Sequence, residues 1–159
     1  MKNFGEIAEG YFRKGYNCSQ SVAAAFAEEM GMDPELVLKT SAGFGGGFGR
    51  MREVCGAFSG MVFVAGALYG NTDPAGKSAF YAEIQELARR YKEQNGRGSI
   101  VCRELLGLKK PEGTPVAEAR TEEYYKKRPC PELIRIAADI MGAYVQEREA
   151  GVSFVQAGK

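Results

Sequence analysis

The chain contains no histidine and no tryptophan among its 159 residues. Without histidine there can be no Ser-His-Asp or Cys-His catalysis and no zinc or haem held by imidazole. Net charge is nearly absent as well, because 21 Lys and Arg stand against 20 Asp and Glu, for a formal charge of +1. Such a balance creates no overall field that selects nucleic acid or anionic lipid. We therefore expect no nucleic-acid partner.

Long apolar runs are also scarce. The first residues lack the apolar run of a secretory signal and instead space Phe4, Tyr11 and Phe12 along one side of a helix, so we expect a cytoplasmic protein. One uncharged segment, residues 54–72, approaches the length of a membrane span. Its glycines are spaced by four, which lets another backbone approach closely, as in buried central helices. We expect a core helix here and no membrane span.

Helix-start and helix-stop signals recur along the chain, whereas strand-like alternation is not sustained. The length is close to that of one domain, so we expect residues 1–159 to form a single helical domain. The sequence predicts an all-α fold, a compact bundle of about six or seven helices around the uncharged central helix. The expected helices lie within residues 1–15, 18–30, 34–42, a segment beginning near Cys55, 75–94, 99–107 and 131–149, with loops at 43–49 and 108–118 and a frayed or partner-docked tail at 151–159.

Four cysteines, Cys18, Cys55, Cys102 and Cys130, remain as the side chains with thiolate chemistry. In a reducing cytosol, reactive or metal-binding thiols are favoured over structural disulfides. No two of the four lie close together in the sequence, so any shared site must be assembled from separate helices. We expect the four to lie close together in space.

Each cysteine has a helix-start signal beside it. At a helix start the unpaired N–H groups and the helix dipole favour a thiolate. Ten Lys or Arg residues, against three acids, lie within five positions of the four cysteines, which also favours lowered thiol pKa values. The signals are Asn17 for Cys18, the Gly-rich residues 43–49 for Cys55, Ser99 for Cys102 and Pro131 for Cys130.

Two alternatives stay open at this point. Cysteine often packs as a small hydrophobe, so four inert, buried cysteines would also explain the pattern. The Gly-rich residues 43–49 fit either a flexible connector or a backbone that must pass close to something at Cys55.

Short motifs around all four cysteines resemble the C_GCAxxG_C_C family of redox-active proteins over nearly the whole chain. The resemblance implies that the four cysteines form the functional set, with Gly56 and Gly60 shaping the backbone at the start of the helix beside Cys55. Val54 precedes Cys55 where the family pattern has glycine, so the match is to the CGAxxG form. The motifs are Asn17-Cys18-Ser19-Gln20, the Gly-rich run into Cys55-Gly56-Ala57-Phe58-Ser59-Gly60, Cys102-Arg103-Glu104-Leu105-Leu106-Gly107 and Cys130-Pro131.

A domain related to this family occurs in split-Soret cytochromes, which carry haem and an iron–sulfur cluster. Haem cannot transfer to this chain, because it has no histidine and no C-x-x-C-H attachment site. Only the sulfur-based site could be shared.

Three functions follow for the cysteine set. The first is thiol-dependent redox chemistry, in which cysteines cycle between dithiol and disulfide with a partner protein or a small thiol and need no cofactor. Cys55 and Cys130 are the expected exposed pair. The second is an electron-transfer module in which Cys18, Cys55, Cys102 and Cys130 ligate an iron–sulfur cluster or zinc. The third is a helical partner-binding subunit with buried structural cysteines, and a homo-oligomer is compatible with all three.

Overall fold

The computed structural model describes residues 2–110 and 113–152. Within these ranges the chain forms nine α-helices, six of them seven residues or longer, and no β-strand. The predicted all-α fold is therefore confirmed, and the expected tail lies largely outside the described residues. The helices are α1 (Phe4–Arg13), α2 (Cys18–Ala24), α3 (Ala27–Met30), α4 (Pro34–Ser41), α5 (Gly56–Tyr69), α6 (Lys77–Gln94), α7 (Cys102–Leu105), α8 (Glu122–Lys127) and α9 (Cys130–Glu149), with 3-10 turns η1 (Ala42–Phe44) and η2 (Pro74–Gly76).

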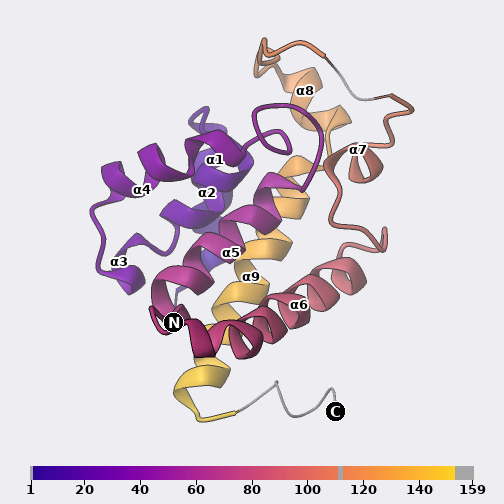
Figure 1. Cartoon of the computed structure of the whole chain (residues 1–159). Coiled ribbons are helices and arrows are strands. Elements are labelled where there is room, and N and C mark those ends of the chain that lie inside the picture. Colours follow the sequence, from indigo (N-terminus) through magenta and orange to yellow (C-terminus); the bar gives the residue numbers. More distant parts are fainter. Residues whose placement is uncertain (1, 111–112, 153–159) are drawn as a thin grey trace.

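The uncharged helix α5 lies at the centre of the bundle, as predicted. It packs against α2, α6 and α9 (Figure 1). Met61, Val64 and Ala65 of this helix are at most 1% exposed. None of the helices in the described ranges is long and apolar enough to cross a membrane. The burial of α5 on several sides explains why it can be uncharged throughout.

The helix expected over residues 18–30 is divided in two. α2 ends at Ala24, and α3 begins at Ala27 after a turn that contains Phe26. Phe26 is fully buried and stacks on Phe4, with ring centroids 4.2 Å apart. The aromatic contact with α1 thus accounts for a break that helical periodicity did not predict.

The helix expected from Ser99 begins only at Cys102. The Ser99 hydroxyl accepts a hydrogen bond from the Val101 amide at 2.9 Å, and Val101 forms an isolated antiparallel bridge with Val54. The Cys55 amide donates to the Ile100 carbonyl at 2.7 Å. This short pairing joins the chain before α5 to the chain before α7, and it brings Cys55 and Cys102 to the same side of the bridge.

Candidate functional site

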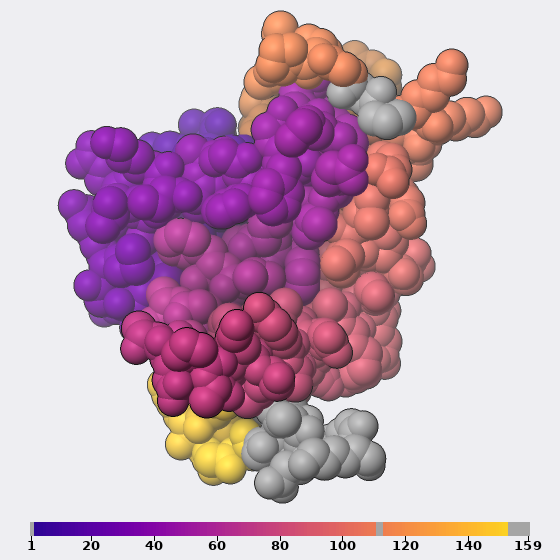
Figure 2. Space-filling model, viewed as in Figure 1, coloured from indigo at the N-terminus to yellow at the C-terminus, as the bar shows by residue number. Residues whose placement is uncertain are grey.

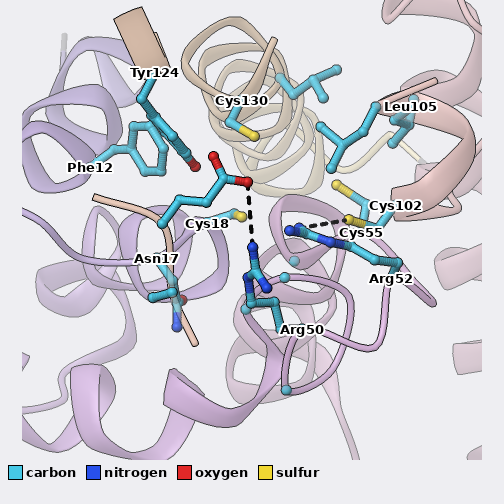
Figure 3. A pocket seen from close by; sticks show the side chains of 18 of the residues that line it. Phe12, Asn17, Cys18, Arg50, Arg52, Cys55, Cys102, Leu105, Tyr124 and Cys130 are labelled. Carbon is cyan, nitrogen blue, oxygen red and sulfur yellow. Dashed lines mark hydrogen bonds and ion pairs between the residues drawn. The ribbon is translucent and has the colours of Figure 1, made fainter. Parts of the chain in front are cut away.

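All four cysteines line one cavity of about 410 Å³ (Figure 3). Each stands at a helix start, as Asn17 and Pro131 predicted for Cys18 and Cys130, whereas the helix at Cys102 begins three residues after Ser99. Segments remote in sequence therefore meet at one cavity. Cys18 is the first residue of α2, Cys55 the N-cap of α5, Cys102 the first residue of α7 and Cys130 the first residue of α9.

The start of α2 is fixed by Asn17. Its side chain accepts from the Gln20 amide, while the Gln20 side chain accepts from the Asn17 amide, which makes a capping box. The side-chain amide of Asn17 (Nδ2) also donates a hydrogen bond to the Ala42 carbonyl at 2.9 Å. A Cβ on Gly45 would lie 2.3 Å from the Asn17 side chain. Cys18 is thereby held at a defined position under the Gly-rich segment.

Gly56 and Gly60 allow α5 to approach α2 closely. A Cβ on Gly56 would lie 3.3 Å from the Cys18 sulfur, and one on Gly60 would lie 2.8 Å from the Val22 Cβ. Gly56 lines the cavity, as the predicted role requires, whereas Gly60 is not among its lining residues. Gly60 therefore acts on helix packing at a distance from the thiols.

The Gly-rich segment forms a left-handed turn. Residues 46–50 all have positive φ, and so does Arg52. A residue with a side chain pays roughly 1–2 kcal/mol for this conformation, and such strain is found mostly at functional sites. Hydrogen bonds hold the turn, among them Arg50 N–H to the Gly45 carbonyl at 3.2 Å and Arg52 N–H to the Gly46 carbonyl at 3.0 Å. The segment forms part of the cavity wall in a defined conformation.

This turn approaches Cys18 and Cys102. The Gly46 amide donates a hydrogen bond to the Cys18 sulfur, and a Cβ on Gly47 would lie 2.8 Å from the Cys102 Cβ. One of the two alternatives from the sequence was a close backbone approach at Cys55. In the structure the backbone passes close to Cys18 and Cys102.

Cys18 and Cys130, the two partly exposed thiols, act on each other's pKa. The hydrogen bond from Cys130 is the main reason why the pKa of Cys18 is lowered to about 6; the Gly46 amide and the charge of Arg120 act in the same direction against burial. The same hydrogen bond, with burial, raises the pKa of Cys130 well above its usual value. Negative charge is therefore favoured on Cys18 and disfavoured on Cys130.

Cys55 and Cys102 lie deeper, at 5% and 7% exposure. Burial raises the pKa of Cys55 to about 12, with a further contribution from the Cys18 charge, while Tyr91 Oη lies 3.3 Å from the sulfur. Burial also raises the pKa of Cys102, opposed by Arg52, whose Nη1 lies 3.8 Å from the Cys102 sulfur. Cys55 was expected to be one of the exposed pair. That prediction is wrong, because Cys55 is buried beside Tyr91, and the two partly exposed thiols are Cys18 and Cys130.

The cavity wall is positively charged. Arg50, Arg52 and Arg120 line it together with a single acid, Glu118. Arg50 and Arg52 were among the basic residues noted around the cysteines, whereas Arg120 lies outside those windows and was missed. Arg120 donates to the Phe12 carbonyl at 2.8 Å and to the Tyr16 carbonyl at 3.0 Å. No signal in the sequence indicated that it would come to the cysteines.

A segment of residues 113–121 covers the cavity. Arg50 donates to the Thr114 carbonyl at 3.0 Å and pairs with the Glu118 carboxylate at 3.4 Å (Figure 3). Arg128 donates to the same Glu118 oxygen from the turn before α9. Figure 2 shows the left-handed turn, in purple, against the orange part of the chain at the top of the molecule. Arg50 and Glu118 thus join the two walls of the cavity.

Four thiols are a donor set that suits zinc or an iron–sulfur cluster. In the part of the chain that the structure describes, however, no three Cys, Asp or Glu side chains stand together as a ready-made ligand group. The cysteines as placed do not fit a resident metal, and four-cysteine ligation stays a prediction from the sequence.

One family model matches the chain, that described as "Putative redox-active protein (C_GCAxxG_C_C)", over residues 16–144. No curated protein and no solved structure matches. The match begins just before Cys18 and extends through most of α9, so it includes every cysteine and every residue of the cavity wall except Phe12. The chain belongs to the C_GCAxxG_C_C family.

Proposed function

We propose that this protein is a thiol–disulfide redox protein in which Cys18 is the attacking thiolate and Cys130 the resolving thiol. The observation that carries the proposal is that Cys18 and Cys130, the two partly exposed thiols, line one cavity and shift each other's pKa in opposite directions. An attacking and a resolving thiol are therefore available in the same site. The family description supports redox activity without naming a mechanism.

The pKa values assign the two roles. A pKa of about 6 makes Cys18 largely thiolate at neutral pH, and the thiolate is the form that attacks disulfides. Cys130 keeps its proton, because a second negative charge beside the first is unfavourable. Cys55 and Cys102 are buried, with raised pKa values, and serve as packing beneath the reactive pair.

The reaction runs in two exchanges. The Cys18 thiolate attacks a substrate disulfide R–S–S–R, the bond Cys18–S–S–R forms, and the first R–S⁻ leaves and takes a proton from solvent. The Cys130 sulfur then attacks the Cys18 sulfur, and its proton passes to the second R–S⁻ as that group leaves. The protein ends as a Cys18–Cys130 disulfide and the substrate as two thiols, so two electrons pass from the protein to the substrate. A dithiol of a partner protein or of a small molecule reverses both steps.

Cysteine-to-serine variants test the proposal. We expect Cys130→Ser to accumulate a mixed disulfide on Cys18 when treated with 2-hydroxyethyl disulfide, because nothing resolves it. Cys18→Ser should form adducts much more slowly than Cys130→Ser does. Cys55→Ser should still form the Cys18–Cys130 disulfide. Peptide mapping by mass spectrometry after thiol blocking identifies each product.

Two results would overturn the proposal. One is equal adduct formation in Cys18→Ser and the parent protein. The other is iron or zinc at one equivalent per chain in an anaerobic preparation, lost in Cys55→Ser, which would favour four-cysteine metal ligation instead.

A further inference from the structure

We propose that the substrate of this site is a small, negatively charged disulfide, and that Arg50 binds its carboxylate in the position that Glu118 holds in the closed cavity. The disulfide part rests on the proposed function. The anion-binding part rests on the cavity wall alone and can be tested without any disulfide.

The side chains that line the cavity include more positive than negative groups. Three guanidinium groups, those of Arg50, Arg52 and Arg120, face one carboxylate, that of Glu118, and one thiolate, that of Cys18. Arg52 contacts the Cys102 sulfur, and Arg120 is bound to two main-chain carbonyls. An attacking thiolate repels an anionic substrate, so positive groups beside it are needed for such a substrate to approach. The wall provides them.

Glu118 acts as an internal occupant of the anion position. Its carboxylate lies across Arg50 and Arg128, yet its side chain is 39% exposed, against 13% for Arg50. It is carried by residues 113–121, which form no helix until Thr121 caps α8. A carboxylate that is half in solvent and held on an irregular segment costs little to displace, since exposed ion pairs contribute about 1 kcal/mol or less. A substrate carboxylate can therefore take its place on Arg50.

The dimensions of the cavity indicate a small molecule. Its volume of about 410 Å³ falls within the range of roughly 300–1,000 Å³ that is typical of small-molecule sites. Residues 113–121 and the left-handed turn close over the thiols from two sides, joined by the contacts of Arg50. Arg50 and Cys18 line the same cavity, so we infer that a disulfide with one carboxylate on each arm can contact both residues.

Two alkylating reagents test the anion site without redox chemistry. Iodoacetate is negatively charged, iodoacetamide is neutral, and both alkylate the same thiolate with loss of iodide. We use the ratio of the rate with iodoacetate to the rate with iodoacetamide at Cys18. Changes in thiolate fraction and in exposure affect both rates equally and cancel in this ratio. Divided by the same ratio for free 2-mercaptoethanol, it reports the preference of the site for an anion.

Three single-residue variants give the expected pattern. Arg50→Gln should lower the ratio roughly fivefold, the effect of one partly exposed ion pair. Glu118→Gln should raise the ratio, because the competing carboxylate is removed. Arg89→Gln is the matched control, since Arg89 pairs with Glu86 and Glu93 on α6 and is not among the residues that line the cavity. Its ratio should equal that of the parent protein.

The outcomes separate the two proposals. A parent ratio no higher than that of 2-mercaptoethanol, or equal ratios in the parent and Arg50→Gln, would overturn the anion site. If the Arg50→Gln variant does not fold, a ratio in Glu118→Gln that equals the parent ratio would also overturn the anion site. If the anion site stands, negatively charged dithiodiglycolate should oxidise the protein faster than neutral 2-hydroxyethyl disulfide does. A normal anion preference with no disulfide formation would leave the anion site standing and overturn the redox proposal.

Discussion

Cys130, at the first position of α9, and Cys18, at the first position of α2, line the same cavity and shift each other's pKa in opposite directions. Both residues stand where helical N–H groups are unpaired, so each helix start favours negative charge on its own cysteine. A negative charge on one of them, however, opposes a second negative charge on the other. The asymmetry between the two thiols thus arises from two similar local environments placed at one cavity.

The reactivity of Cys18 should follow a low pKa. We expect its alkylation rate to rise with pH around a midpoint near 6 and to be nearly constant above pH 8. In Cys130→Ala the donor is lost and the midpoint should move upward toward the ordinary thiol value, whereas Cys130→Ser keeps a hydroxyl donor and should move less. Iodoacetamide labelling followed by mass spectrometry measures both. Identical profiles in the two variants would contradict the role of the hydrogen bond.

The thiol pair should also make stability depend on pH. Cys18 has a folded pKa below its unfolded value, so its contribution to the free energy of unfolding grows between about pH 6 and pH 9 and is lost as the pH falls through 6. Cys130 has a raised folded pKa, so its contribution is present below pH 9 and is lost above it. The pair should therefore contribute most near pH 9. Urea unfolding of the parent and of the double variant Cys18→Ser/Cys130→Ser, compared across pH, gives the difference; a flat difference would speak against the shifts.

Gly60 should be intolerant of a side chain, whereas Gly66 on the same helix should accept one. A methyl group at Gly60 meets Val22 Cβ at 2.8 Å and the Ser19 carbonyl at 2.9 Å, so Gly60→Ala should lower the free energy of unfolding by about 1–3 kcal/mol. Nothing lies within 4 Å of the corresponding position on Gly66, and Gly66→Ala should raise it by up to about 1 kcal/mol through helix propensity. Thermal or urea unfolding of both variants and of the parent protein measures these changes in the free energy of unfolding. Equal effects would mean that the α2–α5 approach is wider than described.

The left-handed turn offers a second matched pair. Gly47 and Gly49 both have positive φ, at 71° and 56°, so alanine is strained at each by about 1 kcal/mol or more. Only at Gly47 would the new methyl group also meet the Glu53 amide at 2.6 Å and Cys102 Cβ at 2.8 Å. Gly47→Ala should therefore be the more destabilising variant and should alter the alkylation rate of Cys18. A Gly49→Ala variant that is equally impaired would show that the turn responds to backbone strain alone.

The sequence alone determined the features that arise within a few residues of each other. Asn17 and Pro131 predicted the helix starts at Cys18 and Cys130, because caps and first-turn prolines act on the adjacent backbone. The spacing of glycines and the lack of charge predicted a buried α5. The ordered cysteine motifs indicated the family.

Only the tertiary structure decided which cysteines are buried. Cys55 has a helix-start signal like the others, but it is buried beside Tyr91 of α6, a contact that is not visible in its local sequence. Arg120 reaches the cavity through carbonyls of Phe12 and Tyr16, more than a hundred residues before it in the chain. Burial and charge are set by whatever segments pack around a group, and a thiol pKa depends on both. Local sequence therefore determines that the thiols stand at helix starts, and long-range packing determines how their pKa values are shifted.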